Sequence, residues 1–438
     1  MLALQYVRPH LPFPASTYPN TWLDSTNIPT SRLFERGAES CGQDFQSHPF
    51  WDKYIEFEER LEEHGRIFDI LSKIIHLPLH QYSRYFQRYS AMSKQQPIEK
   101  LAPVDVLAPL QAEVQQAHSN PADFDRELRA RLDKYHYEVV FTQTQNEVTK
   151  RWTYEQGIKR PYYHVTDLDE EELTNWGKYL DYEESEGDYA RIKFLYERCL
   201  VSAANYEDFW FRYARWLAAQ PGKEQEVRNA YQRASCIYIP IAQPAIRLSY
   251  ANFEESQGRA EVAIGIHEAV LMFMPDHLEA IRSLVNLHRR QYGVDAAVEV
   301  LRKYTEDGDC TPQTRGALVA EWARILWRSR GDSAGARALF ESTQNQFLDS
   351  QPFWSSWLSF EIELPSNESE ESTAHDRVRT VHKAIREKST LPPELVKGLS
   401  TLYTRYLEER GGKDAMQELL KLDAELNGPA SVQNAASA

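Results

Sequence analysis

Four glutamates are the first candidates for chemistry in this chain. Each stands seven residues after the start of a short aromatic phrase, and positioned carboxylates are common general acids and bases. They recur at one position of separate sequence units, and a carboxylate beside an apolar core must accept hydrogen bonds to be stable there. We therefore interpret them as structural acids, with Arg191, Tyr196 and Arg259 as the expected hydrogen-bond donors. The four are Glu58, Glu183, Glu254 and Glu361.

No other pattern predicts catalytic, cofactor-binding or metal-binding residues. The sequence contains no glycine-rich phosphate or dinucleotide motif, no H-E-x-x-H zinc motif and no G-x-S-x-G nucleophile motif. His76 and His80 have the spacing of a helical metal pair, but Pro78 lies between them and would disrupt that helix. The 4 cysteines are far apart and form no C-x-x-C pair, so we expect neither a zinc site nor disulfides, and a reducing compartment.

One segment, Gly157 to His164, combines cations with aromatic rings just beyond a long helical stretch. In one interpretation it is a rigid elbow whose tyrosines pack that helix onto the next hairpin. In the other it is a contact site for an RNA backbone or for an acidic partner peptide. The sequence favours the elbow and leaves the contact site open. The candidate contact residues are Lys159, Arg160, Tyr162, Tyr163 and His164.

The aromatic phrase itself predicts the elements that position these residues. It places aromatic residues at i, i+3 and i+6, usually with an acid at i+7. On an α-helix these positions lie within one arc of about 120°, so each phrase is one helical face that must be buried. The core residues of the repeats, besides the four glutamates, are Trp51, Tyr54, Trp176, Tyr179, Trp210, Tyr213, Tyr250, Trp354 and Trp357.

The spacing of the phrases predicts repeated helical hairpins. Trp176 and Trp210 are 34 residues apart, and the corresponding Arg247 follows 37 residues later. A unit of this length is one helix-turn-helix hairpin, and stacked hairpins form an all-α solenoid. Glycines suited to left-handed helix ends recur independently, at intervals of 35 to 38 residues. They are Gly187, Gly222, Gly258, Gly293 and Gly331.

Composition along the chain predicts two blocks of hairpins joined by a linker and a long helix. Proline-bearing stretches are expected to be irregular, whereas the proline-free stretch from Ala122 to Gly157 shows apolar residues at helical spacing. The predicted segments are an irregular segment at 1–47, a remnant of an N-terminal array at 48–92, a linker at 93–121, a connecting helix at 122–160, a C-terminal array at 161–427 and a disordered tail at 428–438.

The charge of the chain argues against a protein that coats nucleic acid. The formal net charge is −15, and a broad phosphate-binding surface needs a positive excess. Local basic strips exist, and we interpret them as solvated helix faces balanced by nearby acids. No apolar run is long enough to predict a membrane span. The strips are Arg126, Arg129, Arg131 and Lys134 on one helix, and Arg282, Arg289 and Arg290 further on.

The phrase W-x-x-Y-x-x-[FY]-E resembles the half-a-TPR (HAT) repeat of RNA-processing proteins. Longer stretches narrow the resemblance to the pre-mRNA-processing factor 39 family, whose members are splicing factors associated with the U1 snRNP. The resemblance runs from about Cys41 to Leu422. The stretches that carry it are Phe50 to Tyr89, Tyr154 to Asp188 and Leu195 to Trp216.

The resemblance implies a nuclear, non-enzymatic scaffold that holds U1 snRNP at weak 5′ splice sites through protein contacts, including one with a U1C-like protein. It also implies pairing through the C-terminal array, as a homodimer or as a heterodimer with a paralogue, and we expect self-association beyond about Thr311. Members of the family carry several hairpins before the one at Trp51, so the N-terminal array is expected to be truncated.

Two other functions compete with this one. The first is a HAT scaffold of another RNA-processing machine, for mRNA 3′-end cleavage or ribosomal RNA processing, with direct RNA contact through the segment from Lys159 to His164. The second is an enzyme or enzyme subunit built on helical hairpins, which nothing in the sequence supports.

Overall fold

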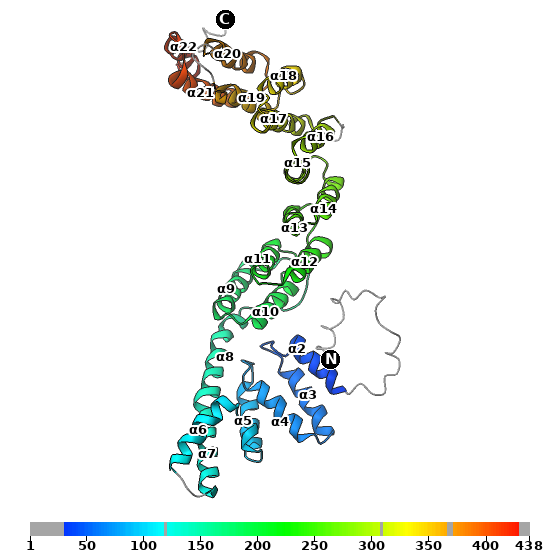
Figure 1. Cartoon of the computed structure of the whole chain (residues 1–438), viewed down its shortest axis with the longest axis vertical. Coiled ribbons are helices and arrows are strands. Elements are labelled where there is room, and N and C mark those ends of the chain that lie inside the picture. The colour runs from blue at the N-terminus through cyan, green and yellow to red at the C-terminus, as the bar shows by residue number, and fades with distance from the viewer. Residues whose placement is uncertain (1–29, 118–120, 307–309, 366–370, 429–438) are drawn as a thin grey trace, which may run out of the picture. The chain divides into compact units, whose positions relative to one another are not determined.

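The computed structural model describes residues 30–117, 121–306, 310–365 and 371–428, and every regular element in those ranges is a helix (Figure 1). The all-α prediction is confirmed. The chain divides into two compact units, residues 1–209 and 210–438, with the boundary inside α11 (Glu207–Ala218). Residues 161–209 group with the first unit, and the predicted start of the C-terminal array at residue 161 stays a prediction. The predicted disordered tail lies outside the described residues from residue 429 on.

Within the first unit, residues from Phe34 to Val148 share one hydrophobic core. Trp51, Phe68, Tyr89 and Leu132 belong to this core, so the helices before and after residue 100 share it. Its helices are α2 (Thr30–Cys41), α3 (His48–Arg60), α4 (His64–Ile74), α5 (Tyr82–Ser93), α6 (Val104–Ala117), α7 (Pro121–Tyr135), α8 (Thr142–Glu155), α9 (Glu170–Glu186) and α10 (Tyr189–Ser202).

Two stretches that were predicted to be irregular are helical. Within the predicted irregular segment 1–47, residues 30–41 form α2, whose Phe34 packs against the core. The predicted linker at 93–121 contains a short 3-10 helix (Ile98–Lys100) and α6, and it buries Leu107 and Val114. In the predicted linker, Pro97 and Pro103 immediately precede a helix, where a missing N–H costs nothing, and Pro109 lies inside α6.

A long helix occupies most of the predicted connecting segment. Residues 121–155 are helical throughout, with a π-helical segment at His136–Phe141 between α7 and α8. Leu128 and Val140 lie in the same core as α3 to α5, and the Thr144 hydroxyl donates to the carbonyl of Ile75 at 3.2 Å. The helix therefore packs along the N-terminal hairpins.

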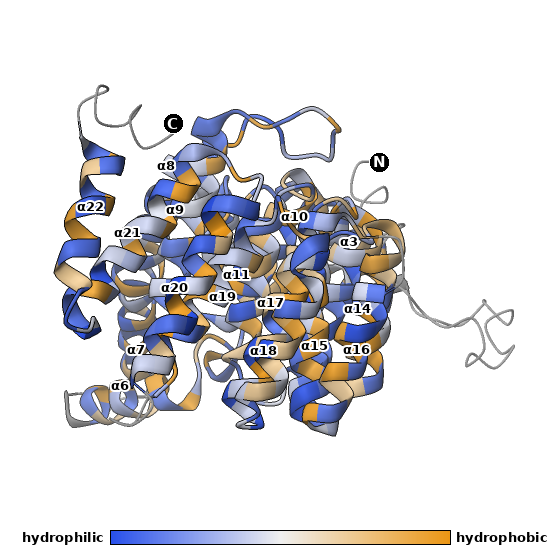
Figure 2. Ribbon diagram, turned by 90° about the horizontal axis from the view of Figure 1, so that it is seen from above, coloured by the Kyte–Doolittle hydropathy of each residue, from blue (hydrophilic) through white to orange (hydrophobic). Residues whose placement is uncertain are grey.

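The second unit is a run of helical hairpins in chain order (Figure 1). Apolar and polar residues alternate around helices such as α16, α17 and α18 (Figure 2), as expected of helices that bury one face. After α11 the helices are α12 (Glu224–Arg233), α13 (Ala245–Ser256), α14 (Ala260–Phe273), α15 (Leu278–Tyr292), α16 (Val294–Glu306), α17 (Pro312–Ser329), α18 (Ser333–Thr343), α19 (Gln351–Glu363), α20 (Glu371–Lys388), α21 (Pro393–Arg410) and α22 (Ala415–Asn427).

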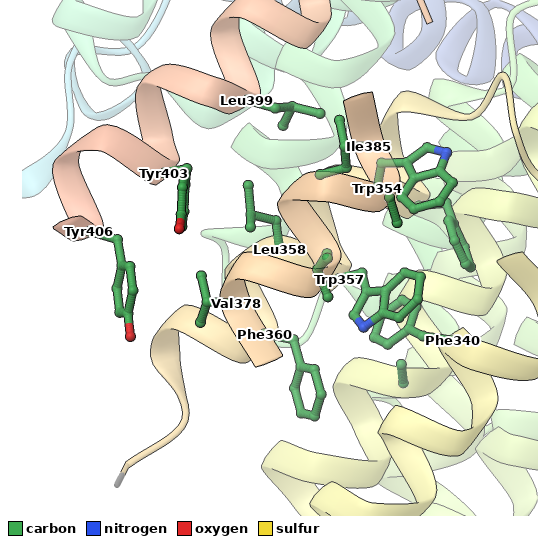
Figure 3. Packing of buried hydrophobic residues seen from close by; sticks show 14 of the residues in the cluster. Phe340, Trp354, Trp357, Leu358, Phe360, Val378, Ile385, Leu399, Tyr403 and Tyr406 are labelled. Atoms are coloured by element: carbon green, nitrogen blue, oxygen red, sulfur yellow. The ribbon is translucent and has the colours of Figure 1, made fainter. Parts of the chain in front are cut away.

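The aromatic phrases form the core as predicted. Trp176, Trp210 and Trp354 are among the largest fully buried side chains. Figure 3 shows the cluster around Trp354 and Trp357 of α19, which side chains of α18, α20 and α21 enclose. Each hairpin thus buries its aromatic face against its neighbours and not in one central core.

The five glycines end their helices in the left-handed region. Their φ angles are 83° at Gly187, 94° at Gly293 and 72° at Gly222, Gly258 and Gly331. A side chain is strained at such angles, so the sequence period marks true hairpin turns.

Stability is expected to fall on acidification because of a buried histidine. The ring of His382 in α20 stacks on Tyr403 at 4.2 Å, and its Nε2 lies 3.0 Å from the Ser400 hydroxyl. Burial, with a contribution from Arg386, lowers the pKa of His382 from 6.5 to about 4. The unfolded chain therefore binds more protons between these values, so stability is complete above pH 6.5 and is lost as the pH falls toward 4.

At pH 5 this histidine alone should cost about 2 kcal/mol of unfolding free energy. Urea unfolding at pH 7.5 and at pH 5 measures the loss, and His382→Phe, which keeps a ring against Tyr403, should reduce it. An equal pH dependence in both proteins would contradict the assignment to His382.

Candidate partner-binding surface

Three of the four repeat glutamates are held by arginines from neighbouring helices. Glu183 of α9 is buried, and Arg151 of α8 donates to both of its oxygens at 2.7 and 2.9 Å. Arg191, a predicted donor, contacts it at 3.4 and 3.5 Å. Tyr196 was the wrong donor, since its hydroxyl donates to Glu184. Equivalent pairs are Arg228 (2.7 Å) and Arg259 (3.6 Å) on Glu254, and Arg337 (2.7 Å) and Arg377 (3.5 Å) on Glu361.

Burial and charge act in opposite directions on these groups. Burial by itself would lower the pKa of Arg151, but the hydrogen bonds and charge of Glu183 outweigh it and raise that pKa. Burial by itself would raise the pKa of Glu254, but the hydrogen bonds that Arg228 and Tyr250 donate to it outweigh burial and lower that pKa. The charged forms of Arg151 and Glu254 are therefore stabilised by their ion pairs.

A second contact accompanies each of these ion pairs. Three residues after the arginine of the preceding helix stands an aromatic residue that stacks on the next phrase. We call this arrangement the Arg-x-x-aromatic clamp. The spacing of this clamp is readable in the sequence, but the clamp was not predicted. The stacked pairs are Tyr154 on Tyr179 (5.1 Å between ring centroids), Tyr231 on Tyr250 (5.5 Å) and Phe340 on Trp357 (5.6 Å).

Glu58 is the exception, because its clamp lacks the arginine. Phe34 of α2 stacks on Tyr54 at 4.9 Å, but Ser31 stands three residues before it. Both carboxylate oxygens of Glu58 are buried without a hydrogen-bond partner. Arg66, 3.9 Å from the carboxylate, donates instead to the Ser31 hydroxyl at 2.9 Å.

Ser31→Arg should therefore stabilise the first unit. The new guanidinium would complete the clamp on Glu58, and a hydrogen bond to a charged group contributes about 1.5–3 kcal/mol before the entropy of the side chain is subtracted. We expect a gain of about 1 kcal/mol in urea unfolding. Ser31→Lys is the matched control, because an ammonium group cannot bind both oxygens in a fork. An equal gain from lysine would contradict the clamp geometry.

The elbow between α8 and α9 is held by hydrogen bonds to two residues of α9. The side-chain amide of Asn175 donates to the carbonyl of Tyr154 at 2.8 Å, and a Cβ on Gly157 would meet Asn175 at 2.7 Å. Buried Glu172 accepts from the backbone N–H of Arg160 at 3.1 Å. Residues of the helices α8 and α9 therefore set the bend.

The candidate contact residues lie in a small closed loop beyond this bend. Arg160 donates to the hydroxyl of Thr166 at 2.8 Å and to its carbonyl at 2.7 Å, which ties the two ends of the loop together. His164 is exposed and its Nδ1 lies 2.8 Å from the Thr166 hydroxyl. Tyr162 is 55% exposed and Tyr163 49%. The predicted packing of these tyrosines on the long helix stays a prediction.

The cations of the elbow, Lys159 and Arg160, already have partners within the protein. Lys159 Nζ lies 3.6 Å from both Asp169 and Glu171. A groove of about 500 Å³ opens beside it. The groove is lined by Gly157, Lys159, Glu170, Glu171, Thr174, Asn175 and Lys178.

The basic strips are largely balanced by acids, as predicted. Arg129 pairs with Asp125 at 3.2 Å, and Arg290 pairs with Glu255 at 2.6 Å. Among the described residues, no group of three or more histidine, cysteine or acidic side chains could hold a metal ion. None of the described helices is both long and apolar enough to cross a lipid bilayer.

Comparisons with known proteins agree with the helical repeat. The family models described as PRP39 N-terminal HAT repeat and PRP39 C-terminal HAT repeat match residues 15–91 and 149–290. The solved crystal structure of CstF-77 is similar in fold, with a TM-score of 0.55 at 14% identity, over 90% of this chain and 77% of that one.

Curated relatives extend this match over most of the chain. Pre-mRNA-processing factor 39 of Schizosaccharomyces pombe is 43% identical over 92% of this chain and 68% of its own length. The human protein of that name is 27% identical over 82% of this chain and 56% of its own length. Cleavage stimulation factor subunit 77 of Arabidopsis thaliana is 24% identical over 74% of this chain and 42% of its own length. From the repeat, the clamp and these matches, we conclude that the chain belongs to the pre-mRNA-processing factor 39 family of HAT-repeat proteins.

Proposed function

We propose that this chain is a nuclear, non-enzymatic scaffold of the U1 snRNP, which acts in 5′ splice-site recognition and early spliceosome assembly through protein contacts, including one with a U1C-like protein. Family membership carries the proposal. The use of the repeated acids in structural ion pairs supports it, because a scaffold works through shape and surface.

The experiment is purification of the tagged full chain from nuclear extract, followed by mass spectrometry. U1 snRNP proteins should be recovered, and a tag without the chain is the control. Recovery without any U1 protein would contradict the proposal.

A second candidate, a scaffold of mRNA 3′-end cleavage, is favoured by the match to a cleavage stimulation factor subunit. Recovery of cleavage factors in place of U1 proteins would favour this second candidate.

We also propose that the chain pairs with a second copy or a paralogue through its C-terminal array. The last described helix, α22, leaves Met416 49% and Leu420 67% exposed one helical turn apart. Exposed apolar residues at such spacing are typical of a helix that packs against a partner.

The double variant Met416→Lys, Leu420→Lys should shift a dimer to a monomer in light scattering at micromolar concentration. Met272→Lys with Phe273→Lys, at the exposed end of α14, is the matched control and should leave the mass unchanged. A wild-type chain that is monomeric throughout would contradict pairing with a second copy.

A further inference from the structure

We infer that the loop from Arg160 to Thr166, which we call the knob, is a preformed docking element that enters an apolar depression on a protein partner with lysine or arginine side chains around it. The inference rests on the proposed scaffold role and names the chemistry of one partner surface. The knob stands on the elbow between α8 and α9, two helices of the first unit.

The knob is ordered before any partner binds. The guanidinium of Arg160 closes the loop on Thr166 through two hydrogen bonds, at 2.8 and 2.7 Å. Pro161 fixes one backbone angle inside it. The chain leaving the loop is fastened as well, because Leu168 is buried and its N–H donates to the Tyr206 hydroxyl at 2.7 Å. A loop held in this way loses little entropy on binding.

The outward side of the knob is apolar and aromatic. Tyr162, Tyr163 and Val165 are 55%, 49% and 74% exposed. Tyrosine is enriched at the energetic centres of protein interfaces because a large ring is fixed at the cost of two rotatable bonds. Two tyrosines and a valine on one ordered loop are better buried in a complementary depression than left exposed to solvent.

Charge distinguishes a protein partner from RNA. Four exposed carboxylates flank the knob, and the ammonium groups that line the adjoining groove are those of Lys159, already shared between two acids, and Lys178. Arg160 is turned into the loop, and its backbone N–H donates to buried Glu172. Phosphates would be repelled from such a surface, whereas lysine or arginine on a partner would be attracted. The flanking acids are Asp167, Asp169, Glu170 and Glu171.

A photo-crosslinking residue, p-benzoylphenylalanine, in place of Tyr163 of the full chain tests the inference in the native particle. The expected product is a crosslink to one protein segment in which apolar side chains are accompanied by lysine or arginine. Binding of that protein should fall about tenfold or more in Tyr162→Ser with Tyr163→Ser, as for interface centres. Met272→Ser with Phe273→Ser, on an exposed apolar pair of the second unit, should leave it unchanged.

A charge variant separates the two classes of partner. Asp167→Lys with Glu170→Lys should weaken the crosslink to protein. A crosslink to RNA that grows stronger in this variant would overturn the inference. The same photo-crosslinking residue in place of Met272 gives the background, and a crosslink from position 163 no stronger than this background would also overturn the inference. If U1 proteins are recovered equally with the wild type and with the tyrosine variant, and no other protein is lost, the docking role of the knob is contradicted. The scaffold proposal is unaffected by that result.

Discussion

Glu183→Gln is expected to lower the free energy of unfolding of the first unit by roughly 3–5 kcal/mol, the usual cost of breaking a buried ion pair from one side. The carboxylate and Arg151 are both nearly inaccessible to solvent, and the guanidinium binds both oxygens. The amide offers Arg151 one neutral acceptor in place of two charged ones. Glu147 and Tyr182 remain as partners of Arg151, so the lower end of the range is the better expectation.

Glu58→Gln is the matched control for this prediction. Glu58 occupies the same position of its repeat and is just as buried, but its oxygens have no hydrogen-bond partner and Arg66 is 3.9 Å away. Removing a poorly paired buried charge costs little or even stabilises, so we expect a change within about 1 kcal/mol. Urea unfolding followed by circular dichroism measures both variants. Equal losses at the two sites would show that the arginines do not determine the cost.

The contrast between these two sites shows what the repeat contributes to stability. In a complete clamp, the arginine and the aromatic residue of one helix both contact the next phrase, as Arg228 and Tyr231 do with α13. Each contact joins neighbouring hairpins only, so stability is a sum of local terms. The clamp therefore fixes the register of each hairpin on the one before it.

The helices and the hairpin turns could be predicted from the sequence because their signals are local. The aromatic phrase has a helical period, and a glycine such as Gly187 takes a φ of 83° that other residues avoid. The acids could be assigned a structural role because their position recurs. These features need no knowledge of distant contacts.

The remaining features depend on contacts that a local pattern does not contain. Helices α2 and α6 were missed because proline was read as a breaker, whereas tertiary packing of Phe34 and Leu107 stabilises them. The exposure of Tyr162 and Tyr163 could not be predicted, because it depends on where α9 lies. The partner of Arg160 could not be predicted, since an arginine next to tyrosines fits both an RNA contact and an internal clasp.

Trp354→Ala is expected to lower the free energy of unfolding of the second unit by roughly 3–5 kcal/mol, as for other large-to-small changes at buried tryptophan. The ring is fully buried, stacks on Trp357 at 5.6 Å, meets Phe353 edge-on at 5.5 Å and donates from Nε1 to the carbonyl of Leu348 at 3.3 Å (Figure 3). Alanine would leave a cavity among helices that aromatic rings hold apart. Trp354→Phe, which keeps a ring in place, should lose about half as much.

The locality of the array makes a sharper test possible with the double variant Glu183→Gln, Trp354→Ala. The two residues belong to separate compact units and share no contact partner, so their losses should add within about 0.5 kcal/mol. The measurement is urea unfolding of both single variants and the double variant under one set of conditions. A coupling much larger than this would mean that the two sites are energetically linked and that stability is not the sum of terms between neighbouring hairpins.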